Sequence, residues 1–306
     1  MFQVLVTAGL RFLTHQLKSR KGKILLFDFS KPDAVEELDI VWKNEARFFD
    51  EQFNPHGIDV FTTKKGKTIV FVVNHSPHEA IERFELNLQK KTLTHLESIQ
   101  DPAMRLMNSV VAMGERSFFF SNYLYWHGGV LGKLEVYLDL RFGSVGSYDG
   151  KTSTGMVLKK GYGLANGLAL SRDRTKLYMV NIADMAVDTF LVHSVTNITW
   201  VSSLVLDTVA DNIQVDPDDG SLWLGCHPAP TQTVKYLDSP ETSPVPPSQV
   251  LNVKVDKQGI PADDVTEVYS NRGSQIAAST VALRHKNKLL IGSVCQNTVV
   301  CEIRNQ

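Results

Sequence analysis

The chain has 306 residues, of which 43% are hydrophobic, and a formal net charge of −1. This balance excludes both the basic face of a nucleic-acid-binding protein and an acidic tail, so we expect small molecules or proteins as partners. Because no linker divides the sequence, we predict one domain over residues 1–306. Residues 1–10 lack a basic leader and are followed by Arg11. They are too short for a membrane span of roughly 20 residues and predict no signal segment.

Two strands are predicted near the start of the chain, over residues 4–7 and 23–28, where apolar residues run together. They match the second and third strands of a unit that recurs later in the chain. The first strand of that unit would lie before Met1. We therefore expect the sequence to begin inside such a unit.

Five later segments follow one template, in which a polar residue opens a strand that a turn joins to a second strand. In the clearest case Ile213 and Val215 alternate with polar residues, a turn follows at 216–220, and an apolar strand resumes at Leu222. This is the pattern of a β-hairpin. The predicted hairpins run over residues 56–74, 108–122, 166–181, 212–224 and 279–294.

The hairpins start 52, 58, 46 and 67 residues apart, which is near the period of four-stranded propeller blades with loop insertions. Together with the two strands near the start, they predict an all-β, six-bladed propeller with an incomplete first blade. The open edge beside the missing strand should favour homo-oligomers, since unpaired strand edges template pairing.

In a propeller the inner strand of each blade begins beside the central channel, so His56, Asn108, Asn166 and Asn212 should converge there. The three amides, with Asp211 beside the last, make an oxygen-rich cluster that suits Ca²⁺ better than Zn²⁺. At any one site alone, Asn-Gly and Asp-Asn more simply mark turns and left-handed backbone. Their recurrence at one phase of the repeat favours a metal site.

The first complete hairpin carries a histidine at each end. Asn54-Pro55 forces an extended entry to His56, and Gly57 permits close backbone approach. The partner strand ends at His75, so the hairpin returns a second histidine to the same region. A lone buried histidine is more often a satisfied core residue. Two from one hairpin beside a metal cluster fit a general base and its orienting partner.

The other segments carry weaker signals. An aromatic run over 118–126 is predicted to be core, with Tyr123 or Trp126 lining a pocket, and residues 131–140 are expected to form a short helix. Asn197 opens an N-glycosylation sequon in an outer turn. This sequon can be glycosylated only if the protein enters the secretory pathway. Six prolines in 228–248 predict a surface loop.

The three cysteines, Cys226, Cys295 and Cys301, have no CxxC spacing, which argues against a zinc site.

Seven motifs occur together within the stretch from residue 21 to the end of the chain, the first of them at residue 53. They are Phe-Asn-Pro-His-Gly-Ile at 53–58, Val-Val-Asn-His at 72–75, Ala-Asn-Gly-Leu at 165–168, Asp-Asn at 211–212, Gly-Cys-His-Pro at 225–228, Lys-Leu-Leu-Ile-Gly at 288–292 and Cys-Glu-Ile at 301–303. This set resembles the paraoxonase/arylesterase family, calcium-dependent lactonases with a six-bladed propeller.

The resemblance assigns roles to individual residues. It places the catalytic histidine dyad on His56 and His75 and a substrate-pocket histidine on His227. It gives the Ile58 carbonyl to a second, structural calcium ion. It places the catalytic calcium ligands on four residues, which are Asn108, Asn166, Asp211 and Asn212.

Several family features are missing from this sequence. The family takes a Glu-Asp pair from the first inner strand, one carboxylate for each of two calcium ions, and an aspartate where this chain has Ser109. We therefore expect one weakly bound calcium ion, with Asp211 indispensable. The upstream cysteine that the family pairs with Cys301 is absent, so no disulfide is expected. Tyr123-Leu124 replaces an Asp-His pair of the pocket.

The resemblance implies that Ca²⁺ polarises the carbonyl of a lactone or aryl ester while His56, oriented by His75, activates water. It also implies an extracellular or secretory-pathway membrane location, with membrane or lipid-particle association. The alternative is a non-catalytic, membrane-associated, chaperone-like relative that aids membrane-protein assembly. Loss of the calcium carboxylates favours that alternative, and retention of both histidines favours the enzyme. A sugar-lactone hydrolase of another propeller family fits less well, because its metal site has a different carboxylate pattern.

Overall fold

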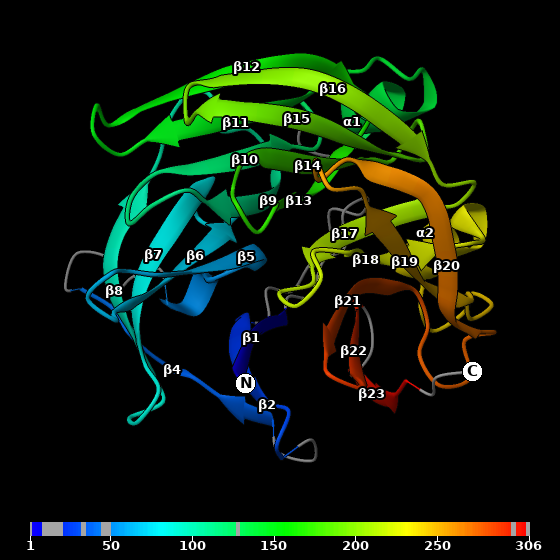
Figure 1. Cartoon of the computed structure of the whole chain (residues 1–306), viewed down its shortest axis with the longest axis horizontal. Coiled ribbons are helices and arrows are strands. Elements are labelled where there is room, and N and C mark those ends of the chain that lie inside the picture. The colour runs from blue at the N-terminus through cyan, green and yellow to red at the C-terminus, as the bar shows by residue number, and fades with distance from the viewer. Residues whose placement is uncertain are drawn as a thin grey trace.

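The computed structural model describes residues 2–7, 21–31, 35–43, 50–126, 129–294 and 298–303, with the backbone alone for residues 2–7. Within these ranges the protein is nearly all β, with two short helices. The strands form six sheets, which stand around a common centre like the blades of a propeller (Figure 1). The all-β propeller predicted from the sequence is therefore confirmed.

Five of the sheets begin with an inner strand, and these strands lie against one another in turn around the centre (Figure 1). The inner strands are β5 (Pro55–Thr62), β9 (Met107–Ala112), β13 (Ala165–Leu170), β17 (Val209–Val215) and β21 (Ser279–His285). Each of them starts one of the five hairpins predicted from the sequence.

The outer strands of these sheets follow their inner strands in chain order, except for β4, which precedes β5. The sheet of β5 adds β6 (Thr68–Asn74), β7 (Ala80–Asn87), β8 (Thr92–Ile99) and, parallel to β8, β4 (Asp39–Val41). The sheets of β9 and β13 add β10 (Phe118–Asn122), β11 (Gly143–Asp149) and β12 (Thr154–Tyr162), and β14 (Lys176–Asn181), β15 (Ala186–Ser194) and β16 (Asn197–Val205). The sheets of β17 and β21 add β18 (Leu222–His227), β19 (Ser248–Val255) and β20 (Pro261–Asn271), and β22 (Lys288–Ser293) and β23 (Val299–Glu302).

The sixth sheet has only three strands, which are β1 (Phe2–Thr7), β2 (Lys23–Asp28) and β3 (Val35–Glu37). Both strands predicted near the start of the chain are present in it. Among the described residues β1 pairs with β2 alone and forms one edge of the sheet. The structure thus confirms five blades with an inner strand, where the sequence predicts six blades.

Every hairpin is irregular at the same place, close to the start of its inner strand. In each of the five blades the pairing of the inner strand with the second strand shifts register there. In four blades the irregularity contains two inner-strand residues, which are His56-Gly57, Asn108-Ser109, Asn166-Gly167 and Asp211-Asn212. A β-bulge re-aims the side chains that it contains. The recurring polar residues therefore leave the regular alternation of their strands.

The hydrophobic core is divided into clusters that lie between neighbouring sheets. Phe71 on β6 packs against Phe118 on β10, and Phe119 on β10 packs in a cluster with Phe190 on β15. Full burial of one such side chain is worth about 1.5–3 kcal/mol. Packing between sheets therefore fixes the inner strands around the centre.

Two helices lie outside the sheets. Helix α1 (Gly129–Tyr137) corresponds to the helix predicted at 131–140. Helix α2 (Pro230–Asp238) lies inside the proline-rich segment for which the sequence predicts a loop, and that prediction was wrong for these residues. The missing N–H and fixed φ of proline suit a first helical turn. Within the described ranges, no helix has the length and apolar character to cross a membrane.

Candidate active site

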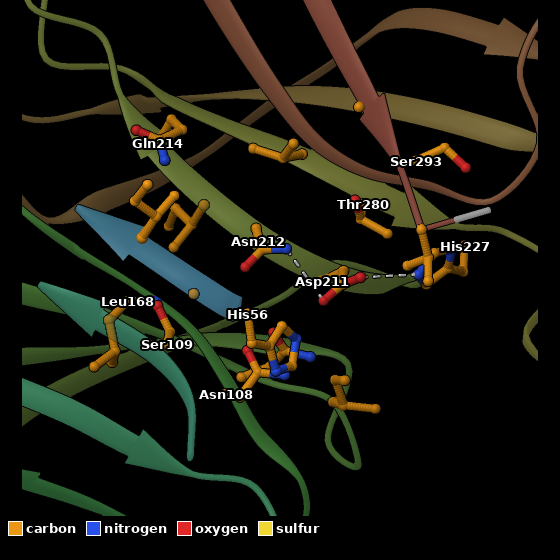
Figure 2. Close-up of a pocket in the computed structure, with 18 of the residues that line it drawn as sticks. His56, Asn108, Ser109, Leu168, Asp211, Asn212, Gln214, His227, Thr280 and Ser293 are labelled. Carbon is orange, nitrogen blue, oxygen red and sulfur yellow. Dashed lines mark hydrogen bonds and ion pairs between the residues drawn. The ribbon is translucent and has the colours of Figure 1, made fainter. Parts of the chain in front are cut away.

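A cavity of about 1500 Å³ occupies the centre of the ring, and all five inner strands contribute residues to its wall. Figure 2 shows His56 beside Asn108, with Asp211 and Asn212 of β17 across from them and His227 next to Asp211. Asn166 of β13 lines the same cavity. The polar residues singled out from the sequence at the strand starts therefore share one cavity.

Two glycines allow the inner strands to approach closely enough for this arrangement. A Cβ atom on Gly57 would lie 2.4 Å from the carbonyl oxygen of Asn108, and one on Gly167 would lie 2.7 Å from the Cα of Asn212. Both distances are shorter than any real Cβ contact. The close approach predicted at Gly57 is thus present, and Gly167 repeats it two blades further on.

The two histidines of the first complete hairpin are hydrogen-bonded to each other. Nδ1 of His56 lies 3.0 Å from Nε2 of His75, and the ring centroids are 5.2 Å apart. The other ring nitrogen of His75, Nδ1, lies 3.0 and 3.1 Å from the two carboxylate oxygens of Glu79. The backbone N–H of Met107 donates to Oε1 of Glu79 at 2.5 Å. The predicted pair is therefore part of a three-residue chain.

The electrostatic setting keeps His56 neutral. The pKa of His56 is lowered from 6.5 to about 3: burial is the main cause, the neighbouring His75 also lowers the pKa, and a backbone hydrogen bond with Met107 partly offsets them. A neutral imidazole has one nitrogen able to accept a proton. His56 therefore has the protonation state of a base at neutral pH.

Two asparagines of the cavity wall have side-chain carbonyl oxygens with no hydrogen-bond partner in the described part of the chain. Oδ1 of Asn108 and Oδ1 of Asn166 are buried, and neither has a hydrogen-bond partner in the described part of the chain. A buried acceptor left unsatisfied costs about 1–3 kcal/mol, so this arrangement favours a bound cation or donor. Amide and carboxylate oxygens are ligands that Ca²⁺ accepts, and these residues therefore fit such an ion.

Asp211 provides the carboxylate of this cluster. Nδ2 of Asn212 lies 3.5 Å from its Oδ1, and Nε2 of His227 lies 3.3 Å from its Oδ2. Burial raises the pKa of Tyr123, and the charge of Asp211 raises it further, which places this phenol in the same polar region. The described residues include no group of three or more His, Cys, Asp and Glu side chains that is placed to hold a metal ion, so the oxygen donors here are mainly amides.

Other residues named from the sequence lie in varied places. Ile58 lines the cavity two residues after His56. Asn197 is exposed where β16 begins, at an outer turn as predicted. Cys226 is buried, Cys301 is half-buried, and both are free thiols, while Cys295 lies outside the described residues.

Glu79 was missed by sequence reasoning. The sequence feature that could have indicated it is an acidic residue four positions after His75, in the short link between β6 and β7. Such a residue can reach back to a histidine at a strand end, but an exposed glutamate in a turn has the same local sequence. Only the packing of this link against Met107 distinguishes the two cases.

Solved structures share the fold at low sequence identity. A luciferin-regenerating enzyme aligns with a TM-score of 0.53 and 12% identity, covering 95% of this chain and 88% of that one. A putative 6-phosphogluconolactonase from Bacteroides fragilis aligns with a TM-score of 0.53 and 14% identity, covering 95% and 87%. These similarities concern the propeller architecture alone.

The relatives found by sequence are much more similar to this chain in sequence identity. Serum paraoxonase/arylesterase 2 of Gallus gallus is 36% identical over 310 residues, covering 96% of this chain and 83% of that protein. Serum paraoxonase/arylesterase 1 of Homo sapiens is 33% identical, with coverage of 96% and 83%, and serum paraoxonase/lactonase 3 of Oryctolagus cuniculus is 33% identical, with coverage of 97% and 84%. The family model described as Arylesterase matches residues 4–303. The chain therefore belongs to the arylesterase family.

Proposed function

We propose that the protein hydrolyses lactones and aryl esters, with His56 as the general base. The observation that carries this proposal is a neutral His56 that is hydrogen-bonded to His75 and lines a cavity with unpartnered amide oxygens. The relatives are named arylesterases and lactonases, which gives the reaction class. Ester hydrolysis needs a base for water and a group that stabilises the oxyanion.

Calcium is the cofactor in this proposal. Four residues would hold one ion, and they are Asn108, Asn166, Asp211 and Asn212. When bound, it supplies Lewis-acid polarisation of the ester carbonyl and stabilises negative charge on the carbonyl oxygen. With one carboxylate among three amides, affinity should be weak, because calcium affinity depends on ligand charge. A second ion at the Ile58 carbonyl has little support, since Ser109 uses its hydroxyl to accept a hydrogen bond from the backbone N–H of Leu168 at 3.1 Å.

The histidines move the proton. Nδ1 of His56 is engaged with His75, so the remaining ring nitrogen of His56 is the atom that takes a proton from water. His75 orients the ring and stabilises the imidazolium that forms during attack. Because water is the nucleophile, no covalent intermediate with the protein is required.

The rest of the cavity wall suits a neutral substrate with an apolar body. It combines the polar groups Tyr123 and His227 with apolar side chains, among them Leu168, Val136 and Val234. His227 could donate to a leaving or ring oxygen of the substrate. The non-catalytic, chaperone-like alternative is not favoured, because it leaves both the dyad and the unpartnered amides without a role.

The small first sheet acts as a sixth, incomplete blade in this proposal. In the other blades the second strand contacts the inner strand of the next blade, as β6 contacts β9 and β18 contacts β21. Strand β1 contacts β5 in the same manner. An experimental structure in which β1 took the inner position would contradict this assignment.

Helix α1 supplies a surface for membrane or lipid-particle association. Around it lie exposed apolar side chains, including Val130 at 75% exposure and Leu138 at 62%. Co-sedimentation with phosphatidylcholine vesicles measures this association.

The exposed sequon at Asn197 would be glycosylated on the secretory path, and a glycosidase-sensitive mass shift would report both the modification and the location.

The test of the proposed function is the variant His56→Gln, assayed on phenyl acetate and on a simple δ-lactone at millimolar calcium. Loss of a general base costs about 10²–10⁴-fold in rate, so kcat should fall by at least about 100-fold. Calcium binding by calorimetry should remain, since the imidazole is not in the ligand set. His193→Gln is the matched control, because His193 is an exposed histidine that bonds only Thr199 in the described contacts. Equal loss of activity and calcium binding would point to a structural histidine instead.

A further inference from the structure

We propose that Glu79 is a positioning residue of this site, which fixes the proton of His75 on Nδ1 and thereby leaves His56 able to act as a base. The inference deepens the proposed function and rests on it. It concerns a residue that lies outside the cavity wall and reaches the base through His75.

The contacts of Glu79 determine which atom donates the hydrogen bond. Both carboxylate oxygens lie within 3.1 Å of Nδ1 of His75, and both side chains are largely buried, with 12% and 10% of their surface exposed. A carboxylate accepts hydrogen bonds and does not donate them. Nδ1 of His75 must therefore carry the hydrogen. In a neutral imidazole its Nε2 is then an acceptor.

The proton placement propagates to His56. Nε2 of His75 lies 3.0 Å from Nδ1 of His56, so an acceptor at His75 requires the hydrogen on Nδ1 of His56. The second nitrogen of a neutral His56, Nε2, is then the unprotonated one. Glu79 thus selects the tautomer in which His56 can take a proton from water.

Glu79 also ties the dyad to the amide cluster. Its Oε1 accepts the backbone N–H of Met107, the residue directly before Asn108. A single carboxylate therefore holds the end of β6 and the start of β9 together. The base and the first amide of the cluster keep a fixed relation through this contact.

The sharpest variant is Glu79→Gln, because it preserves shape but exchanges one acceptor oxygen for a donor. The Met107 N–H occupies the acceptor, at the shorter of the contacts, so the amide NH₂ faces Nδ1 of His75. That nitrogen must then be unprotonated, and the order of hydrogens along the chain reverses. Nε2 of His56 becomes protonated and can no longer accept a proton.

The expected result is a fall in kcat of at least about 100-fold with KM changed less than twofold. Replacing the orienting Asp of a serine protease triad by Asn costs about 10⁴-fold through the same wrong tautomer. In the background His75→Asn, Glu79→Gln should have no further effect, since a residue that acts through another is not additive with it. Glu85→Gln is the matched control, because Glu85 pairs with Lys67 at the surface.

Nitrogen-15 NMR of the labelled histidine rings gives a second readout that does not depend on activity. His75 should show a protonated Nδ1 in the unmodified protein and a protonated Nε2 in Glu79→Gln. An unchanged tautomer, an unchanged kcat, or an equal loss in the His75→Asn background would each overturn the inference. An unmodified protein without esterase activity would contradict the proposed function, while the NMR comparison would still test the proton placement.

Discussion

At the residue scale, asparagine side chains have two different roles in this propeller. Asn122, at the end of β10, accepts the backbone N–H of Arg105 at 2.9 Å and donates to the Ala103 carbonyl at 2.9 Å. Asn108 and Asn166, at the bulges of β9 and β13, leave a buried oxygen without a partner in the described region. The first kind of amide closes a strand end, and the second kind is available to a ligand.

This difference predicts opposite outcomes for one substitution. Asn166→Leu removes an unsatisfied buried acceptor, so without calcium the free energy of unfolding should rise by about 1–3 kcal/mol. The rise in Tm on adding calcium, expected of any ligand that binds the folded state, should disappear. Thermal unfolding in EDTA and in 5 mM calcium, roughly the weak-site range, measures both effects.

Asn122→Leu is the matched control for that experiment. It breaks satisfied hydrogen bonds and should lower the stability with and without calcium, while the calcium-dependent rise in Tm remains. If Asn166→Leu keeps the calcium effect in full, Asn166 does not belong to the ligand set.

The sequence predicted the site residues better than their partners. His56, the asparagines and Asp211 stand out because they recur at one phase of a repeat, and the structure places them around one cavity. Glu79 has no such repeat, and its contact depends on how the link after β6 folds back toward Met107. Local sequence carries no information on that packing.

At the element scale, the hairpin is the unit that the sequence specifies. Alternating apolar residues and turn residues predicted all five inner hairpins, because period-two alternation is a direct property of strands. The bulges were not predicted, because an extra residue can be recognised only by comparing a strand with the strand that it pairs with. The helix at 230–238 was missed because prolines mark both loops and first helical turns.

Neighbouring blades are also joined by charged groups, which gives a pH prediction. Glu97 on β8 contacts Arg83 on β7, and its Oε1 lies 2.8 Å from Nε of Arg116 in the next blade. Burial raises the pKa of Glu97, but the hydrogen bond from Arg116 and the charges of Arg116 and Arg83 outweigh it, so the pKa lies below 4.5. A lowered pKa means that the folded state releases this proton more readily than the unfolded state.

The stability from Glu97 is therefore fully present above about pH 4.5 and is lost as the pH falls through the lower folded-state pKa. Glu97→Gln should lower the free energy of unfolding at pH 7 by about 2 kcal/mol, on the scale of hydrogen bonds to charged groups. At pH 3 the same substitution should lower the free energy of unfolding by less. Urea unfolding across this range is the measurement. Glu36→Gln, which removes an exposed pair with Lys91, should change little at either pH. Equal losses at both pH values would show that charge at Glu97 contributes nothing.

At the scale of the whole molecule, the ring is held together by clusters of unequal size between its sheets. Four clusters join consecutive blades from β5 to β21, and a fifth joins the first sheet to the blade of β5. The cluster that closes the ring is small. Its buried members are Phe27, Phe29 and Leu290. The Nζ of Lys288 adds a hydrogen bond to the Phe29 carbonyl at 2.9 Å.

This closure could be predicted only in outline. The strands at 23–28 and 288–293 are evident from their apolar runs, and the predicted propeller implies that the two ends of the ring meet. Which side chains form the contact depends on the relative position of sheets that are far apart in the sequence, and no local pattern encodes it.

The small closing cluster predicts that the ring opens there before it unfolds. Local opening free energies follow the amount of buried apolar contact, so amides of β2, β22 and β23 should exchange at a free energy below the global value, while amides of β14 exchange only by global unfolding. Phe27→Ala should lower the opening free energy of the seam, since such truncations cost about 3–5 kcal/mol. It should also increase dimer formation in light scattering, because opening exposes strand edges that template pairing. Phe119→Ala, in a cluster between central blades, is the control and should lower the exchange free energy of all these amides together. Equal protection of β22 and β14 in the unmodified protein would show that the seam is as strong as the rest of the ring.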